Sequence, residues 1–306
     1  MRIAFLGTPE FALPSLSALI ARGDTLAVFT QPDRPVGRKA VLTPPPVKVL
    51  AEAHGIPVYQ FEKIRSLEGR AALEAFAPDL CVTAAFGQFL SSKNLAIPRL
   101  GTINVHGSLL PKYRGASPIQ SAIIAGEAVT GVTTMMTDIG MDTGDILMTA
   151  ETPIGENETY GELSERLAEL GAELLLNTLD ALERGTLVRT PQDPDMATVC
   201  HMLAKEDAHI DFTRPRKAIH DLVRGTNPWP CAFASLDGQA LKIFETRMTD
   251  AFFSDAPGTL RERDKKLYLC CVDGALEIVS LQASGKKRMP AGDFIRGCRL
   301  DGKTLC

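Results

Sequence analysis

The chain has 306 residues and a formal net charge of −4, with 45% hydrophobic and 23% charged side chains. This length predicts two domains, because a single hydrophobic core rarely grows so large. No apolar run approaches the roughly 18 residues that a membrane span needs, and the chain opens on an expected strand rather than a signal sequence, so we expect a cytoplasmic protein.

Charge and cysteine content narrow the function classes further. The seven cysteines are odd in number and form no Cys-x-x-Cys pair, which argues against a zinc site and a disulfide framework. Residues 1–204 carry 16 basic and 23 acidic side chains, whereas residues 205–306 carry 17 and 14. The C-terminal part is the better candidate to meet a polyanion, although so small an excess is equally typical of ordinary solubility charge.

The first 150 residues alternate between apolar runs that predict strands and amphipathic stretches that predict helices. The expected strands are 3–7, 26–30, 58–61, 80–85 and 102–106, and the expected helices are 11–22, 47–54 and 67–76. This alternation predicts an α/β fold, an open, doubly wound and mainly parallel sheet of Rossmann-like type. In such sheets the ligand lies at the carboxyl ends of the strands.

The first strand end lacks the glycines of the common nucleotide sites. Gly7-Thr8-Pro9-Glu10 holds one glycine where Gly-x-Gly-x-x-Gly would stand, and the chain has no Walker lysine loop. Neither a nicotinamide cofactor nor ATP is therefore indicated.

Two later loops are candidates for binding. Residues 31–46 form a long connection that carries Arg34, Arg38 and Lys39 with almost no acid. Such a loop could bind a phosphate backbone, but the same composition is equally typical of a solvated insertion stiffened by proline. Residues 84–90 leave another strand end with two phenylalanines around Gly87. They could offer apolar walls to a flat heterocycle, or the phenylalanines could belong to the core.

Asn104 and His106 form the centre of the predicted site. They lie two apart on one expected strand, so they point to the same side of it. An expected strand at 132–137 leads into a glycine-rich turn that carries Asp142. If Asp142 reaches the pair, the site holds a hydrogen-bond donor, a proton carrier and a carboxylate, a set suited to acyl transfer without a covalent intermediate. The carboxylate spacing in this turn is not that of an EF-hand, so we expect no metal.

The rest of the chain predicts a second, smaller domain. Expected helices at 117–125 and 160–183 and a strand at 146–151 complete the first domain, 1–189, and a Pro- and Asp-rich linker covers 190–205. Within 206–306, a helix near 217–224 precedes short alternating segments at 233–236, 241–246, 267–272 and 276–282. Asp-Gly turns separate two pairs of them, which predicts hairpins of a small, OB-like β-barrel. Its turn Gly285-Lys286-Lys287-Arg288 is a candidate polyanion contact.

Several motifs together resemble the folate-dependent formyltransferases, which use 10-formyltetrahydrofolate as the formyl donor. They are the pair in Asn104-Val105-His106, the loop 108–115 and the turn Asp142-Thr143-Gly144-Asp145. Members of this family act on glycinamide ribonucleotide, nucleotide sugars and methionyl-tRNA. These motifs therefore identify the formyl donor better than the formyl acceptor. The stretches 31–48, 205–212 and Asn227-Pro228-Trp229-Pro230 resemble the methionyl-tRNA branch, and the match spans nearly the whole chain. One departure is Lys39-Ala40-Val41-Leu42, where the family would have more lysine, which leaves Arg38 as the main candidate for the acceptor stem.

The resemblance implies a reaction and a set of residues. It implies transfer of the formyl group to the α-amine of methionine on initiator tRNA for translation initiation, with Asn104 as oxyanion donor, His106 as proton carrier and Asp142 as its carboxylate. The expected folate contacts are Ser108, Leu109, Leu110, Pro111, Phe86, Gly87, Gln88, Leu90, Asp138 and Gly140. The expected tRNA contacts are Arg34, Arg38, Lys39, Lys286, Lys287 and Arg288, and Lys112, Tyr113 and Arg114 could face either ligand.

Other functions stay open at this point. The same centre could formylate an amino-sugar nucleotide or hydrolyse formyl-folate, although a small acceptor has no use for the basic loop. Outside enzymes, the chain could be an RNA-binding protein on a decayed catalytic fold, against which the intact set of Asn, His and Asp argues. We expect a monomer.

Overall fold

The computed structural model describes residues 1–37 and 39–306, and the chain divides into two compact units. The first unit consists of residues 1–118, 129–153 and 164–201, and the second of residues 119–128, 154–163 and 202–306. Among the described residues, no helix combines the length and the apolar character that crossing a membrane requires.

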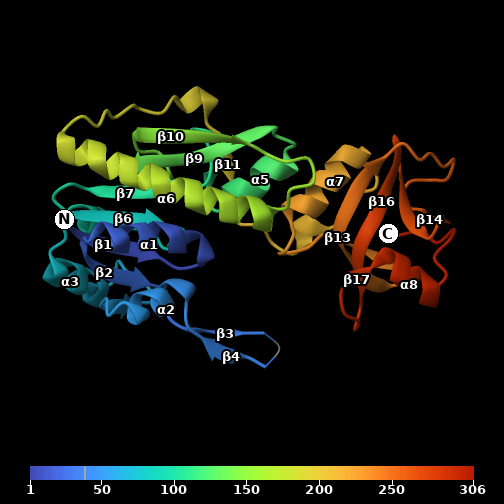
Figure 1. Ribbon diagram of the computed structural model, residues 1–306, viewed down its shortest axis with the longest axis horizontal. Coiled ribbons are helices and arrows are strands. Elements are labelled where there is room, and N and C mark those ends of the chain that lie inside the picture. The colour runs from blue at the N-terminus through green and yellow to red at the C-terminus, as the bar shows by residue number, and fades with distance from the viewer. Residues whose placement is uncertain (38) are drawn as a thin grey trace. The chain divides into compact units, whose positions relative to one another are not determined.

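A seven-stranded sheet organises the first unit, in the order β10-β9-β7-β6-β1-β2-β5 (Figure 1). The strands β7, β6, β1, β2 and β5 are parallel, and β9 pairs antiparallel with both β7 and β10. Their bounds are β1 Arg2–Gly7, β2 Thr25–Thr30, β5 Val58–Gln60, β6 Leu80–Ala84, β7 Thr102–His106, β9 Val129–Met136 and β10 Ile146–Pro153. The predicted mainly parallel sheet is confirmed.

Helices cover both faces of this sheet, which explains why its strands read as unbroken apolar runs. On one face, Leu73 of α3 packs in a cluster with Leu6 of β1 and Phe29 of β2. On the other, α6 approaches β7 and β9 so closely that a Cβ on Gly171 would lie 2.9 Å from Val105. The bounds of the helices up to residue 184 are α1 Leu13–Arg22, α2 Pro46–Ala53, α3 Leu67–Phe76, α4 Ser92–Leu95, α5 Pro118–Ile124 and α6 Tyr160–Arg184, of which α5 lies almost entirely in the second unit.

Local signals define where these helices begin and end. The hydroxyl of Ser66 accepts a hydrogen bond from the Gly69 N–H at the start of α3, which satisfies one of the free amides of the first turn. Gly23 ends α1 in the left-handed conformation, with a φ of 80°.

The basic connection 31–46 differs from the prediction. It was expected to be a loop, but β3 (Arg34–Val36) and β4 (Val41–Thr43) form a two-stranded antiparallel ribbon. All six strand residues are exposed, so no alternation of buried and exposed side chains marks them as strands.

The predicted linker also contains regular structure. After the 3₁₀ turn Pro194–Met196, β11 (Val199–Cys200) pairs in parallel with β8 (Arg114–Gly115). Residues 190–201 of the predicted linker belong to the first compact unit.

The second unit is built on a curled antiparallel sheet, in the order β12-β13-β16-β15-β14, with β17 paired to β16. This sheet agrees with the predicted small barrel, and the turns Asp237-Gly238 and Asp273-Gly274 join β12 to β13 and β15 to β16 as expected. Register shifts near Ile243 and Glu245 bend β13. The element bounds are α7 Arg216–Gly225, β12 Phe233–Leu236, β13 Gln239–Thr249, β14 Leu260–Arg263, β15 Lys266–Cys271, β16 Gly274–Ala283, β17 Met289–Pro290 and α8 Ala291–Gly297.

Candidate active site

β7 places Asn104 and His106 on the same face of the sheet, at the carboxyl end of the strand. Thr83 of β6 lies in register with Asn104, and its hydroxyl donates to the amide oxygen of Asn104 at 2.8 Å. Because this bond occupies the amide oxygen, the amide nitrogen is the group that Asn104 presents to a ligand. Asn104 is only partly buried, so a ligand has access to it.

His106 is only 5% exposed, and each of its ring nitrogens lies close to an oxygen atom of another residue. The Nε2 atom lies 2.9 Å from the Tyr113 carbonyl oxygen, and since a carbonyl only accepts, Nε2 carries the proton. The Nδ1 atom faces the Oδ2 atom of Asp142 at 3.7 Å. Proton exchange is therefore left to Nδ1, where the Asp142 carboxylate would stabilise an imidazolium.

Asp142 comes beside His106 by way of the turn between β9 and β10, at the 3.7 Å given above. Its Oδ2 atom accepts a hydrogen bond from the Gly115 N–H at 2.9 Å, and its backbone is left-handed, with a φ of 53°. The side chain of Gln192 donates to the carbonyl oxygens of Asp142, at 2.9 Å, and Gly144, at 2.7 Å.

The loop that follows His106 is fixed largely by its own bonds. The Ser108 hydroxyl donates to the Lys112 carbonyl oxygen at 2.7 Å, and the Thr133 hydroxyl joins the Ser108 carbonyl to the Leu110 N–H. Ser108 and Leu110 are buried, whereas Leu109 and Pro111 are partly exposed. Among the expected folate contacts in this loop, the latter two side chains are the more accessible.

The loop after β6 uses one predicted folate residue for its own structure. The side-chain amide of Gln88 accepts from the Ile64 N–H at 2.6 Å and donates to the Phe61 carbonyl at 2.8 Å. Phe86 is buried and, with Leu90, belongs to the apolar cluster that contains Leu73, whereas Phe89 is 69% exposed. The structure thus assigns Phe86 to the core and leaves Phe89 and the backbone at Gly87 accessible.

The turn 138–144 is closed by Asp138. Its carboxylate accepts hydrogen bonds from the Thr143 hydroxyl, at 2.7 Å, and the Gly140 N–H, at 3.0 Å. The apolar side chains of Ile139 and Met141 are exposed on the same turn, 82% and 41% respectively. No group of three or more His, Cys, Asp or Glu side chains placed to hold a metal ion occurs in residues 1–37 and 39–306.

The predicted tRNA contacts lie in both units. Arg34 on β3 pairs with Glu62 at 2.5 Å, Lys39 is exposed, and Arg38 lies outside the described residues. In the second unit, the side chains of Lys286 and Lys287 are exposed on the turn between β16 and β17.

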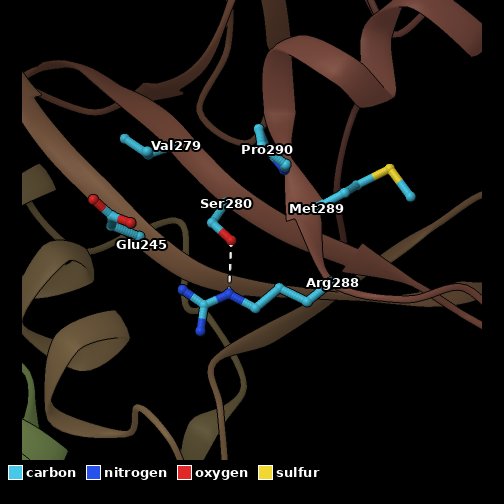
Figure 2. A pocket seen from close by; sticks show the side chains of 6 residues that line it. All are labelled: Glu245, Val279, Ser280, Arg288, Met289 and Pro290. Atoms are coloured by element: carbon cyan, nitrogen blue, oxygen red, sulfur yellow. Dashed lines mark hydrogen bonds between the residues drawn. The ribbon is translucent and has the colours of Figure 1, made fainter.

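Arg288 is held more firmly than its two neighbours in that turn. Its guanidinium lies 4.6 Å from the centre of the Phe244 ring, and its Nε donates to the Ser280 hydroxyl at 2.8 Å (Figure 2). It lines a pocket of about 400 Å³ together with Glu245 and Met289. Part of the predicted basic turn therefore has a structural role.

Three residues that shape the site were not among those predicted: Thr83, Gln192 and Thr198. Thr83 bonds to Asn104 and Thr198 to Tyr113, each at 2.8 Å, and Gln192 bonds to Asp142 at 2.9 Å and to Gly144 at 2.7 Å. A single threonine in an apolar strand, or a glutamine in a Pro-rich segment, carries no local pattern that distinguishes it.

Comparison with known proteins identifies the family. Residues 1–179 match the formyl transferase family, and residues 202–299 match the formyl transferase C-terminal domain. A methionyl-tRNA formyltransferase from Citrifermentans bemidjiense is 51% identical over 98% of this chain and 94% of the relative, and one from Geotalea uraniireducens is 50% identical over 98% and 96%.

A solved structure shares the fold at low identity. The N-formyltransferase from Helicobacter canadensis, in complex with folinic acid and dTDP-3-aminofucose, has a TM-score of 0.70 at 19% identity, with 92% of this chain and 99% of that chain covered. The chain therefore belongs to the formyltransferase family, within the branch of the methionyl-tRNA formyltransferases.

Proposed function

We propose that this chain transfers the formyl group of 10-formyltetrahydrofolate to the α-amine of methionine on initiator tRNA. The observation that carries the choice of acceptor is 51% identity, over nearly the full length of both chains, to a methionyl-tRNA formyltransferase. The product, formyl-Met-tRNA, serves translation initiation, and the enzyme would accordingly act in the cytoplasm.

The accessible residues of the site fit a formylated folate. The Asn104 amide nitrogen suits the formyl oxygen, and the exposed apolar side chains of Phe89, Ile139 and Met141 suit a flat heterocycle. A distant relative of the same fold, the N-formyltransferase from Helicobacter canadensis, has been solved in complex with folinic acid, itself a formylated folate. The donor supplies an activated formyl group, and the protein supplies its orientation and the proton transfers.

The arrangement of Asn104, His106 and Asp142 supports direct transfer. The amine nitrogen bonds to the formyl carbon, the bond from that carbon to the folate nitrogen breaks, and one proton passes from the amine to that folate nitrogen. Asn104 donates to the oxygen as it becomes negative, and His106 carries the proton at Nδ1. Asp142, at 3.7 Å, stabilises the imidazolium while the proton resides there.

A tetrahydrofolate-release assay distinguishes this function from its rivals. We expect release that depends on Met-tRNA and gives formyl-methionine at the tRNA end. Release without any acceptor would indicate a hydrolase, and release with a dTDP-amino sugar but not with Met-tRNA would indicate a sugar enzyme. Binding of tRNA with no release in any arm would indicate an RNA-binding protein without this activity.

Substitution of the three central residues tests the mechanism. We expect Asn104→Ala, His106→Ala and Asp142→Ala each to lower kcat by roughly 10²- to 10³-fold, the usual cost of losing one preorganised group. Asn157→Ala and His54→Ala alter exposed residues of the same types and serve as matched controls with unchanged turnover. Near-normal kcat in any of the three would remove that residue from the mechanism.

A further inference from the structure

Residues 192–200, here called the return segment, run back across the site after α6. Gln192 bridges three groups: its amide nitrogen donates to the carbonyls of Asp142 and Gly144, and its amide oxygen accepts from the Arg114 Nε at 3.0 Å. All of these residues belong to the first compact unit. The return segment therefore joins the turn that carries Asp142 to the loop that carries Arg114.

Thr198 holds Tyr113, the residue whose carbonyl oxygen contacts the Nε2 atom of His106. Its hydroxyl accepts a hydrogen bond from the Tyr113 N–H at 2.8 Å, and its carbonyl accepts from the Arg114 N–H at 2.9 Å. The pairing of β8 with β11 continues this contact to Gly115, where an added Cβ would lie 2.1 Å from the Cys200 carbonyl oxygen. No side chain fits at Gly115, so the return segment lies directly against the loop.

The two residues held in this way have strained backbones. Tyr113 and Asp142 both lie in the left-handed region, with φ values of 59° and 53°, which residues other than glycine rarely adopt without support. Each also provides one contact of the catalytic imidazole, the Tyr113 carbonyl at Nε2 and the Asp142 carboxylate at Nδ1. Both ring nitrogens of His106 thus depend on backbone conformations that the return segment supports.

We propose that Gln192 and Thr198 are positioning residues that fix the orientation and the protonated nitrogen of His106 through Asp142 and Tyr113. This inference rests on the proposed function and extends it to a segment that the sequence indicated only as a linker. Neither residue bonds to the imidazole itself: each acts through one bonded intermediary.

The test uses isosteric variants of the full-length protein in the Met-tRNA assay. We expect Gln192→Met and Thr198→Val to lower kcat roughly ten- to a hundredfold, the usual cost of misplacing a catalytic group, with KM for both substrates within about twofold. Thr198→Ser keeps the hydroxyl and restores kcat. Gln239→Met makes the same change as Gln192→Met at an exposed position and keeps wild-type turnover.

A double-mutant cycle separates positioning from general stability. Because Gln192 acts through Asp142, we expect Gln192→Met to cause no further loss in an Asp142→Asn background. Losses that multiply in that background, or that appear as raised KM together with a lowered melting temperature, would overturn the proposal. If Gln192→Met fails to fold, the comparison of Thr198→Val with Thr198→Ser decides alone.

Failure of the inference and failure of the function give different results. Wild-type transfer to Met-tRNA, with equal kcat in Gln192→Met and Thr198→Val, overturns the positioning role and leaves the proposed function intact. Absence of transfer by the wild-type chain overturns the proposed function and this role with it.

Discussion

The amide of Asn104 would be ambiguous without its neighbour on β6. An asparagine side chain offers either a donor or an acceptor, and a developing oxyanion requires the donor. The Thr83 hydroxyl removes the ambiguity because it donates to the amide oxygen. A residue on the adjacent strand therefore determines which chemistry Asn104 supplies.

Thr83→Val tests this orientation, since it removes the hydroxyl and keeps the shape of the side chain. We expect a loss in kcat of about fivefold, which corresponds to the roughly 1 kcal/mol that such a hydrogen bond contributes, and recovery in Thr83→Ser. Thr30→Val is the matched control, because the buried Thr30 hydroxyl has no partner among the described residues. Equal kcat in Thr83→Val and wild type would show that Asn104 is oriented by other means.

At the scale of single residues, the sequence indicated the three side chains to which we assign the chemistry but not the side chains that bond to them. Asn104 and His106 were found from strand alternation, and Asp142 from its turn. Gln192 and Thr198 contact residues 50 and 85 positions away, and no local spacing indicates contacts of that range. The backbone strain at Tyr113 and Asp142 is likewise visible only in three dimensions.

Among the helices, α7 carries a buried polar residue with a definite titration behaviour. The His220 Nε2 donates to the Glu156 carbonyl at 3.0 Å, and Nδ1 lies 2.8 Å from the Thr246 hydroxyl. Burial lowers the pKa of His220, and the nearby cations Arg224 and Lys217 act in the same direction. The hydrogen bond to Glu156 and the charge of Asp221 oppose this shift but do not cancel it.

This lowered pKa predicts a loss of stability in acid. An unfolded histidine takes up a proton as the pH falls below about 6.5, while the folded His220 resists it, so the unfolded state binds more protons in that range. We expect the melting temperature of the wild type to fall more steeply between pH 7.5 and pH 5 than that of His220→Gln. His54→Gln, at an exposed position, should follow the wild type. Parallel pH profiles for wild type and His220→Gln would contradict the prediction.

The predictability of the elements follows their burial. The parallel strands are apolar on both faces and the hairpins of the second unit carry Asp-Gly turns, so the sequence indicated both. The ribbon β3–β4 is fully exposed, and β14 carries charged side chains at three of its four positions, so neither shows a buried apolar run. No sequence pattern marks these strands, and each is recognised only by its pairing with a neighbouring strand.

For the whole molecule, the distribution of charge determines how a polyanion would be bound. The excess of positive charge lies in residues 205–306, and Lys286 and Lys287 are exposed there. Arg288 is engaged with Phe244 and Ser280, so the two lysines are the better candidates for phosphate contacts.

The double substitution Lys286→Ala and Lys287→Ala should raise KM for tRNA, leave KM for folate unchanged, and flatten the salt dependence of tRNA binding. Each lost phosphate contact lowers the slope of log K against log salt by roughly one. Lys93→Ala, at an exposed position of α4, controls for general loss of charge. A salt slope equal to that of the wild type would exclude this turn from the tRNA interface.

The pairing of β8 with β11 also sets the order in which the protein matures during synthesis. The Tyr113 N–H and the Thr198 hydroxyl, bonded across this junction, are 85 residues apart, and chains fold from the N-terminus as they leave the ribosome. A nascent chain that has emerged only to residue 189 contains β7 and the turn of Asp142 but neither Gln192 nor Thr198. The sheet is then complete in sequence, whereas the return segment that bonds to Asp142 and Tyr113 emerges about a dozen residues later.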